Sequence, residues 1–79
     1  MSNNIYEIIN GISLSNRDYF TVMHHFSEWI FWNKKADEAI TKDDIEIFKQ
    51  EKRNIINKSD DIINASIIKY FKYLNKNIF

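Results

Sequence analysis

The stretch from Tyr19 to Trp32, YFTVMHHFSEWIFW, limits the possible folds of this chain most strongly, because it contains both tryptophans and three of the six phenylalanines. At 100° per residue, six of its apolar side chains form one stripe along a helix. Phe20 and Phe31 fall together on a second flank, and Trp32 lies nearly opposite the centre of the stripe. A helix that is apolar on more than one side is the middle of a bundle or one half of an interface. The stripe consists of Tyr19, Val22, Met23, Phe26, Trp29 and Ile30.

Two capping patterns divide the chain into helices. An S-x-x-D pattern at Ser15 precedes the aromatic run, and a T-x-x-D pattern at Thr41 precedes the second half. Such patterns start helices because the hydroxyl and the carboxylate accept hydrogen bonds from backbone N–H groups that have no partner within the helix. We therefore predict a helix from residue 16 to about residue 40, roughly 36 Å long. The reversal of the chain is expected between residues 36 and 42.

The second half has an apolar seam that keeps one angular phase from Ile45 to Leu74. Its spacing alternates between three and four residues, which is a heptad pattern. This favours one continuous helix over residues 42–76, about 52 Å long. The shorter first helix cannot cover the whole of a helix of that length. A continuous helix over residues 42–76 therefore predicts self-association, which would cover its remaining apolar residues. The alternative is a turn at residues 57–58 with a new helix starting at Ser59, which would close a compact three-helix bundle.

The N-terminal segment is predicted to be a short helix over residues 3–10. Asn3 or Asn4 would cap its start, its isoleucines would share a face, and Gly11 would end it in the left-handed conformation. The expected fold class is therefore all-α. One helical domain, residues 1–79, would hold a short N-terminal helix and a hairpin of two long helices, completed by self-association.

The side chains that could take part in catalysis or bind a metal do not form a catalytic or metal-binding motif. There is no cysteine, which excludes disulfides and thiolate metal sites, and the single glycine forms no phosphate-binding loop. His24 and His25 point about 100° apart on a helix, so they cannot chelate one ion together. The pair of His24 and Glu28 lacks a third ligand. We expect a protein that is not an enzyme and that uses no metal and no cofactor.

Charge and hydropathy indicate where such a protein works. Eleven basic residues balance eleven acidic ones, so the chain has no net positive charge that would attract nucleic acid or an anionic membrane. The N-terminus has no signal-peptide pattern, and no apolar run approaches the roughly 20 residues that span a bilayer. We expect a cytoplasmic protein that meets membranes only indirectly, through a partner.

The surplus of aromatic residues predicts a protein-binding surface. Phe20, Phe31 and Trp32 lie outside the main stripe, so we expect them to contact a partner, either another protein or a second copy of the chain. Tyr70 and Phe71 are further candidate contacts, because they lie in the part of the long helix that the first helix cannot cover.

The alternative function is a small nucleic-acid-binding regulator. From residue 62 onward the chain has three lysines and no acidic residue, and tyrosines lie between the lysines. Cations interleaved with aromatic rings are typical of single-strand-binding surfaces. The residues that would form this site are Lys69, Tyr70, Lys72, Tyr73 and Lys76.

Three segments carry a resemblance to a known family. They are NNIYEIINGISLSNRDYF at the start, HHFSEWIFW in the aromatic run, and ASIIKYFKYLN near the end. With these segments the chain resembles the small cytoplasmic lysis-inhibition accessory proteins of T-even phages over nearly its whole length. The resemblance implies a regulator that binds the cytoplasmic part of the phage holin and helps the periplasmic antiholin to delay lysis. It contains no chemical motif, so it assigns no role to individual residues.

Overall fold

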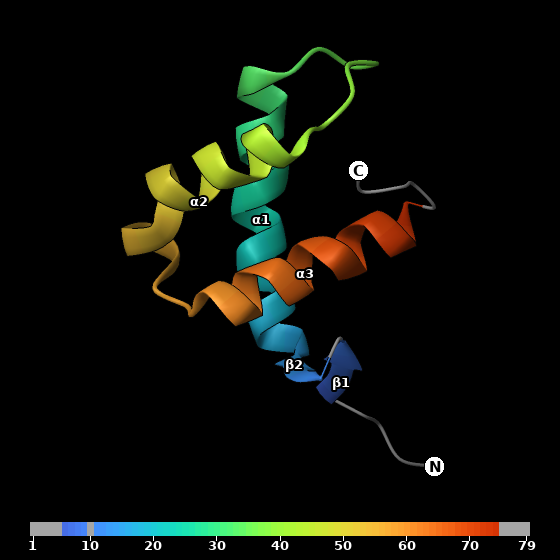
Figure 1. Cartoon of the computed structure of the whole chain (residues 1–79), viewed down its shortest axis with the longest axis vertical. Helices are drawn as coiled ribbons and strands as arrows, with labels where there is room; N and C mark the ends of the chain where they lie inside the picture. The colour runs from blue at the N-terminus through green and yellow to red at the C-terminus, as the bar shows by residue number, and fades with distance from the viewer. Residues whose placement is uncertain (1–5, 10, 75–79) are drawn as a thin grey trace.

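The computed structural model describes residues 6–9 and 11–74, which form a small β-hairpin followed by three helices. Helix α1 runs along the long axis of the molecule, and α2 and α3 both cross it (Figure 1). The hairpin lies at the end of the molecule where α1 begins. The elements are β1 (Tyr6–Ile9), β2 (Ile12–Ser15), α1 (Asn16–Asn33), α2 (Lys42–Ile56) and α3 (Asp60–Tyr73).

The hairpin shows that the predicted helix over residues 3–10, and with it the all-α fold class, is wrong. Strands β1 and β2 pair antiparallel with Ile9 opposite Ile12, and Gly11 lies between them with a φ of 81°. A glycine with positive φ ends many helices but also forms the turns of hairpins, so Gly11 fitted both interpretations. Residues 3–5 and 10 of the predicted segment lie outside the described residues.

Helix α1 begins as its capping pattern predicts but ends earlier. The Asp18 N–H donates to the Ser15 hydroxyl at 3.1 Å. The helix ends at Asn33 instead of near residue 40, because Lys34 is extended. The Lys34 ammonium forms an ion pair of 2.8 Å with Asp44 in the first turn of α2. The polar segment after Asn33 is therefore a loop that is tied to the start of the next helix.

The continuous helix over residues 42–76 is also wrong, and the break near residue 59 is what the structure has. Asn57 ends α2 in the left-handed conformation, with a φ of 54°. The Ser59 hydroxyl then accepts from the Ile62 N–H at 3.2 Å and starts α3. With the helix broken, α1 has no long uncovered partner, so the argument for self-association from unequal helix lengths no longer holds.

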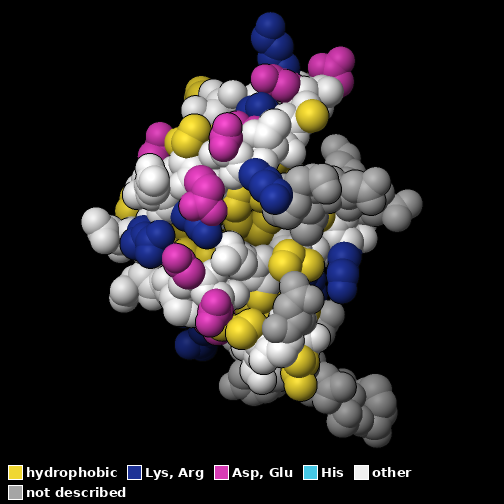
Figure 2. Space-filling view, in the orientation of Figure 1, with side chains coloured by type: hydrophobic (Ala, Val, Ile, Leu, Met, Phe, Trp, Pro, Cys, Tyr) yellow, Lys and Arg dark blue, Asp and Glu magenta, His cyan; other side chains and the backbone are white. Residues whose placement is uncertain are grey.

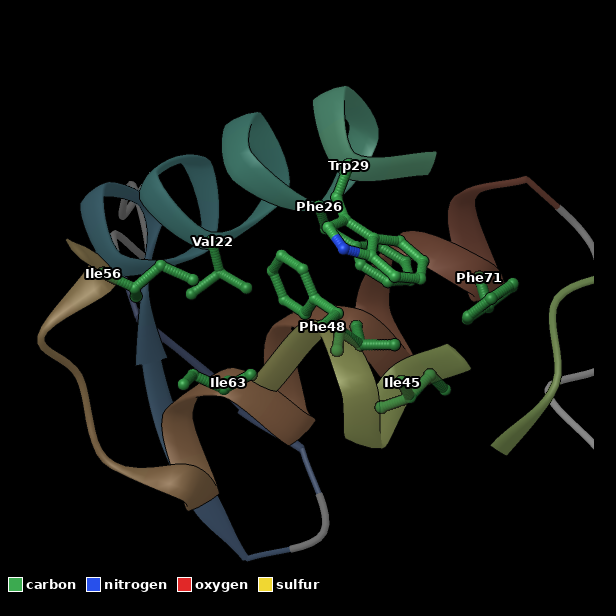
Figure 3. Close-up of a cluster of buried hydrophobic side chains, with 9 residues drawn as sticks. Val22, Phe26, Trp29, Ile45, Phe48, Ile56, Ile63 and Phe71 are labelled. Carbon is green, nitrogen blue, oxygen red and sulfur yellow. The ribbon is translucent and has the colours of Figure 1, made fainter. Parts of the chain in front are cut away.

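The core lies between α1 and the two later helices (Figure 3). Its centre is Phe26, whose ring centroid is 4.8 Å from that of Phe48 on α2 and 6.2 Å from that of Phe71 on α3. Because α2 and α3 both turn an apolar face towards α1, the seam keeps its phase across the break. A second buried cluster packs the hairpin against the start of α1 and against α3. It consists of Ile9, Leu14, Tyr19 and Ala65.

Candidate protein-binding surface

The inner face of α1 is attached to α2 by a buried tryptophan. Trp29 is only 5% exposed, and its Nε1–H donates to Oε1 of Glu51 on α2 at 2.7 Å. Its ring centroid is 6.0 Å from that of Phe48, with the planes steeply inclined. The main apolar stripe of the helix therefore faces the core: Tyr19, Phe26 and Trp29 are buried, and Ile30 is partly buried against the core.

The outer face of α1 is the set of residues Phe20, His24, Glu28, Phe31 and Trp32. Its three aromatic side chains remain exposed, by 56% at Phe20, 74% at Phe31 and 75% at Trp32. The sequence pattern predicted that these three lie outside the intrachain core, and this is confirmed. At 1.5 Å per residue, the row from Phe20 to Phe31 extends roughly 17 Å along the helix.

The rings of Phe31 and Trp32 form a pre-ordered pair. Their centroids are 5.3 Å apart and their planes are inclined by 84°, an edge-to-face arrangement. Exposed aromatic groups of this kind mark interaction sites more often than isolated exposed aliphatic residues do. The pair therefore offers a partner a continuous apolar contact on a helix that the core already holds in place.

The two candidate contacts on α3 do not belong to the outer face of α1. Phe71 is 2% exposed and packs in the core, so it is not available to a partner. Tyr70 is half-buried, with its ring centroid 6.0 Å from that of Phe26. Both residues were proposed as contacts because a continuous helix would have left them uncovered, and the break in that helix places them beside α1.

The candidate nucleic-acid residues are split between different surroundings. The Lys69 ammonium lies 4.5 Å above the centroid of the Tyr19 ring, so it takes part in packing the start of α1. Lys72 and Tyr73 are exposed at the end of α3. Lys76 lies outside the described residues. Within the described part of the chain, only one lysine and one tyrosine of this set are exposed.

A groove between the hairpin, α2 and α3 was not predicted. It has a volume of about 580 Å³, with an apolar floor bordered by charged side chains (Figure 2). In its wall, the buried ammonium of Lys49 contacts Oδ1 of Asn64 at 3.2 Å and the carboxylate of Glu46 at 3.1 Å. The groove depends on the hairpin, which is why the sequence pattern gave no sign of it. Its lining residues include Ile9, Ile12, Ile45, Ala65 and Ile68.

Two ion pairs hold the ends of α1 to the later part of the chain and lower carboxyl pKa values. The Lys34 ammonium, followed by the Thr41 N–H, lowers the pKa of Asp44 from its ordinary 3.8. The Lys58 ammonium, 2.8 Å from Asp18, similarly lowers the pKa of Asp18. A pKa that is lower in the folded state contributes stability above the unfolded value of 3.8 and loses it as the pH falls through the folded value.

We therefore expect the thermal midpoint to fall as the pH is lowered from 5 towards 2.5. The variants Asp18→Asn and Asp44→Asn should each be less stable at pH 7 and should show a smaller loss on acidification. Calorimetry over this pH series measures the effect. Asp37→Asn, at an exposed carboxyl in the loop after α1, is the control. If both variants lose as much stability with acid as the parent does, these ion pairs are not the cause.

Within residues 6–9 and 11–74, no three side chains of His, Cys, Asp or Glu gather as a metal site would require. None of the helices that the structure describes is both long and apolar enough to cross a membrane.

Comparisons with known proteins identify no relative. The chain matches no protein-family model, and neither a curated protein nor a solved structure shows significant similarity to it. The exposed aromatic side chains on the outer face of α1 are therefore the feature from which a function can be proposed.

Proposed function

We propose that this chain is a non-enzymatic regulatory protein that acts by binding another protein through the outer face of α1. One observation carries the proposal: three aromatic side chains are more than half exposed on the helix whose opposite side builds the core. Burial of Phe20, Phe31 and Trp32 within the chain is not needed for folding, because the core is already closed around Phe26. Their exposure costs solubility, and a binding role accounts for that cost.

The size of the surface is compatible with moderate affinity. The exposed parts of the three rings amount to on the order of 400 Å² of mostly apolar surface. Burying this area is worth roughly 10 kcal/mol before the entropic costs of association are subtracted. The polar residues His24 and Glu28 between the rings would add directional contacts. The surface therefore supports binding when the partner offers a well-fitting apolar site.

The resemblance to phage lysis-inhibition accessory proteins supplies a specific partner for this proposal. On that basis the partner is the cytoplasmic part of a phage holin, and the chain acts in the host cytoplasm. A small protein that binds the holin stoichiometrically would then add to the effect of the periplasmic antiholin. Regulation by binding requires no catalytic residues.

The proposal is tested by affinity capture with the tagged chain from nuclease-treated lysate of phage-infected cells. We expect one protein to co-purify in a fixed ratio, and a holin if the resemblance identifies the partner. If the chain instead retains only nucleic acid from untreated lysate, and releases it as salt is raised, the exposed Lys72 and Tyr73 become the site. Binding through cations is salt-dependent in that way, whereas apolar contacts are not.

A further inference from the structure

The outer face of α1 is complementary to the same face of a second copy in antiparallel orientation. Phe20 and Phe31 lie within about 20° of each other around the helix, since 11 residues make slightly more than three turns at 3.6 residues per turn. The midpoint between these two residues falls within about 1 Å, along the axis, of the midpoint between His24 and Glu28. Both pairs are therefore centred at the same level along the axis of α1, near residue 26, with their midpoints about 50° apart around the helix.

We infer that, when no other partner is bound, a second copy of this chain covers the outer face of α1 in an antiparallel helix pair. A two-fold axis near residue 26 would place Phe20 of one copy beside Phe31 of the other, and His24 beside Glu28. This inference rests on the proposed use of that face as a protein contact. Two-fold pairing of one patch with itself is the commonest way in which identical chains associate.

The chemistry of the central contact favours the second copy as the occupant. An imidazole donates an N–H to a carboxylate whether it is neutral or protonated, so His24 and Glu28 of the other copy are complementary in both states. The symmetry produces this contact twice. The aromatic rings then lie at the two ends of the contact, where each copy places Phe31 beside Phe20 of the other. The Trp32 ring lies against Phe31, with centroids 5.3 Å apart.

The area of the contact is sufficient for a weak dimer. Two copies would bury on the order of 800 Å² from their aromatic side chains alone. The intervening residues of α1 add to this value and bring it close to the lower limit of stable interfaces, about 1,200 Å². A dimer of this size is in exchange with the monomer, so a protein partner can displace the second copy. Self-association would thus shield the aromatic rings until the partner is present.

The test is a charge swap that is measured by sedimentation equilibrium of the full chain at neutral pH. We expect a monomer–dimer equilibrium for the parent. His24→Glu, which faces Glu28 of the other copy, and Glu28→Lys, which faces His24, should each raise the dissociation constant about tenfold, since each alters two symmetric contacts. The double variant should return to within about threefold of the parent, because the swapped charges pair again.

Two controls separate the dimer from other effects. Asp37→Lys makes the same change in net charge as Glu28→Lys but lies in the loop after α1, and it should leave the dimer unchanged. Circular dichroism melts show whether the variants remain folded. A chain that stays monomeric at all concentrations overturns the inference. So does a dimer whose dissociation constant is unchanged in both single variants, or one that the double variant does not restore. Partner capture that still occurs in those cases leaves the proposed function in place.

Discussion

Replacing Trp29 by alanine is expected to lower the free energy of unfolding by about 3–5 kcal/mol. The change leaves a cavity beside Phe48 and removes the N–H donor that Glu51 accepts from at 2.7 Å. A domain of this size has only a few kcal/mol of net stability, so the variant should be largely unfolded at room temperature. Trp29→Phe, which keeps an aromatic ring and loses only the donor and part of the volume, should be intermediate.

The matched substitution Trp32→Ala should change the free energy of unfolding by less than about 0.5 kcal/mol, because this side chain is 75% exposed. Urea unfolding followed by circular dichroism compares the three variants with the parent under one set of conditions. The two tryptophans lie three residues apart on the same helix, so the comparison keeps the residue type and the helix the same and changes the face. Equal destabilisation by both alanine variants would show that the two faces of α1 are assigned incorrectly.

Phe31→Ala and Trp32→Ala are expected to weaken binding to the captured protein partner at least tenfold each. Aromatic residues at the centre of an interface typically lose 2 kcal/mol or more on truncation, and here each ring also supports the other. Titration calorimetry or surface plasmon resonance with the purified partner measures the change. Because the variants remain folded, a loss of affinity reports on the surface itself.

Ile55→Ala is the control for these two variants. Ile55 is 61% exposed on α2, away from α1, so it tests whether any exposed apolar side chain matters. Unchanged affinity in this variant, together with the losses at Phe31 and Trp32, locates the contact on the outer face of α1. The reverse pattern would move the binding site to α2 and would remove the basis of the proposed function.

Local signals in the sequence predicted the starts of α1 and α2 correctly. Ser15 and Thr41 cap α1 and α2 through hydrogen bonds to residues three positions away, and such contacts depend on nearby sequence alone. The spacing of apolar residues within α1 also separated Trp29 from Trp32 correctly. Both successes concern information contained within a few helical turns.

The errors concern features that tertiary contacts decide. Strands β1 and β2 have only four residues each, and the hairpin gains its stability from packing Ile9 and Leu14 against α1 and α3. The continuous helix was favoured over a break at Ser59 because the apolar phase continues across the break. The sequence predicts Phe71 in a binding surface because an unbroken helix would leave it uncovered. The chain reversal at Asn57 places Phe71 in the core instead.

Helix α1 builds the core with its inner face, and we propose that it contacts a protein partner with its outer face. The most direct test is fluorine NMR of the chain labelled with 5-fluorotryptophan, which has one resonance for each of the two tryptophans. Trp32→Phe assigns the resonances. On addition of the captured partner, we expect the Trp32 resonance to shift and to become protected from a soluble paramagnetic probe, while that of Trp29 stays unchanged. Binding that leaves the Trp32 resonance unshifted and unprotected would contradict the account.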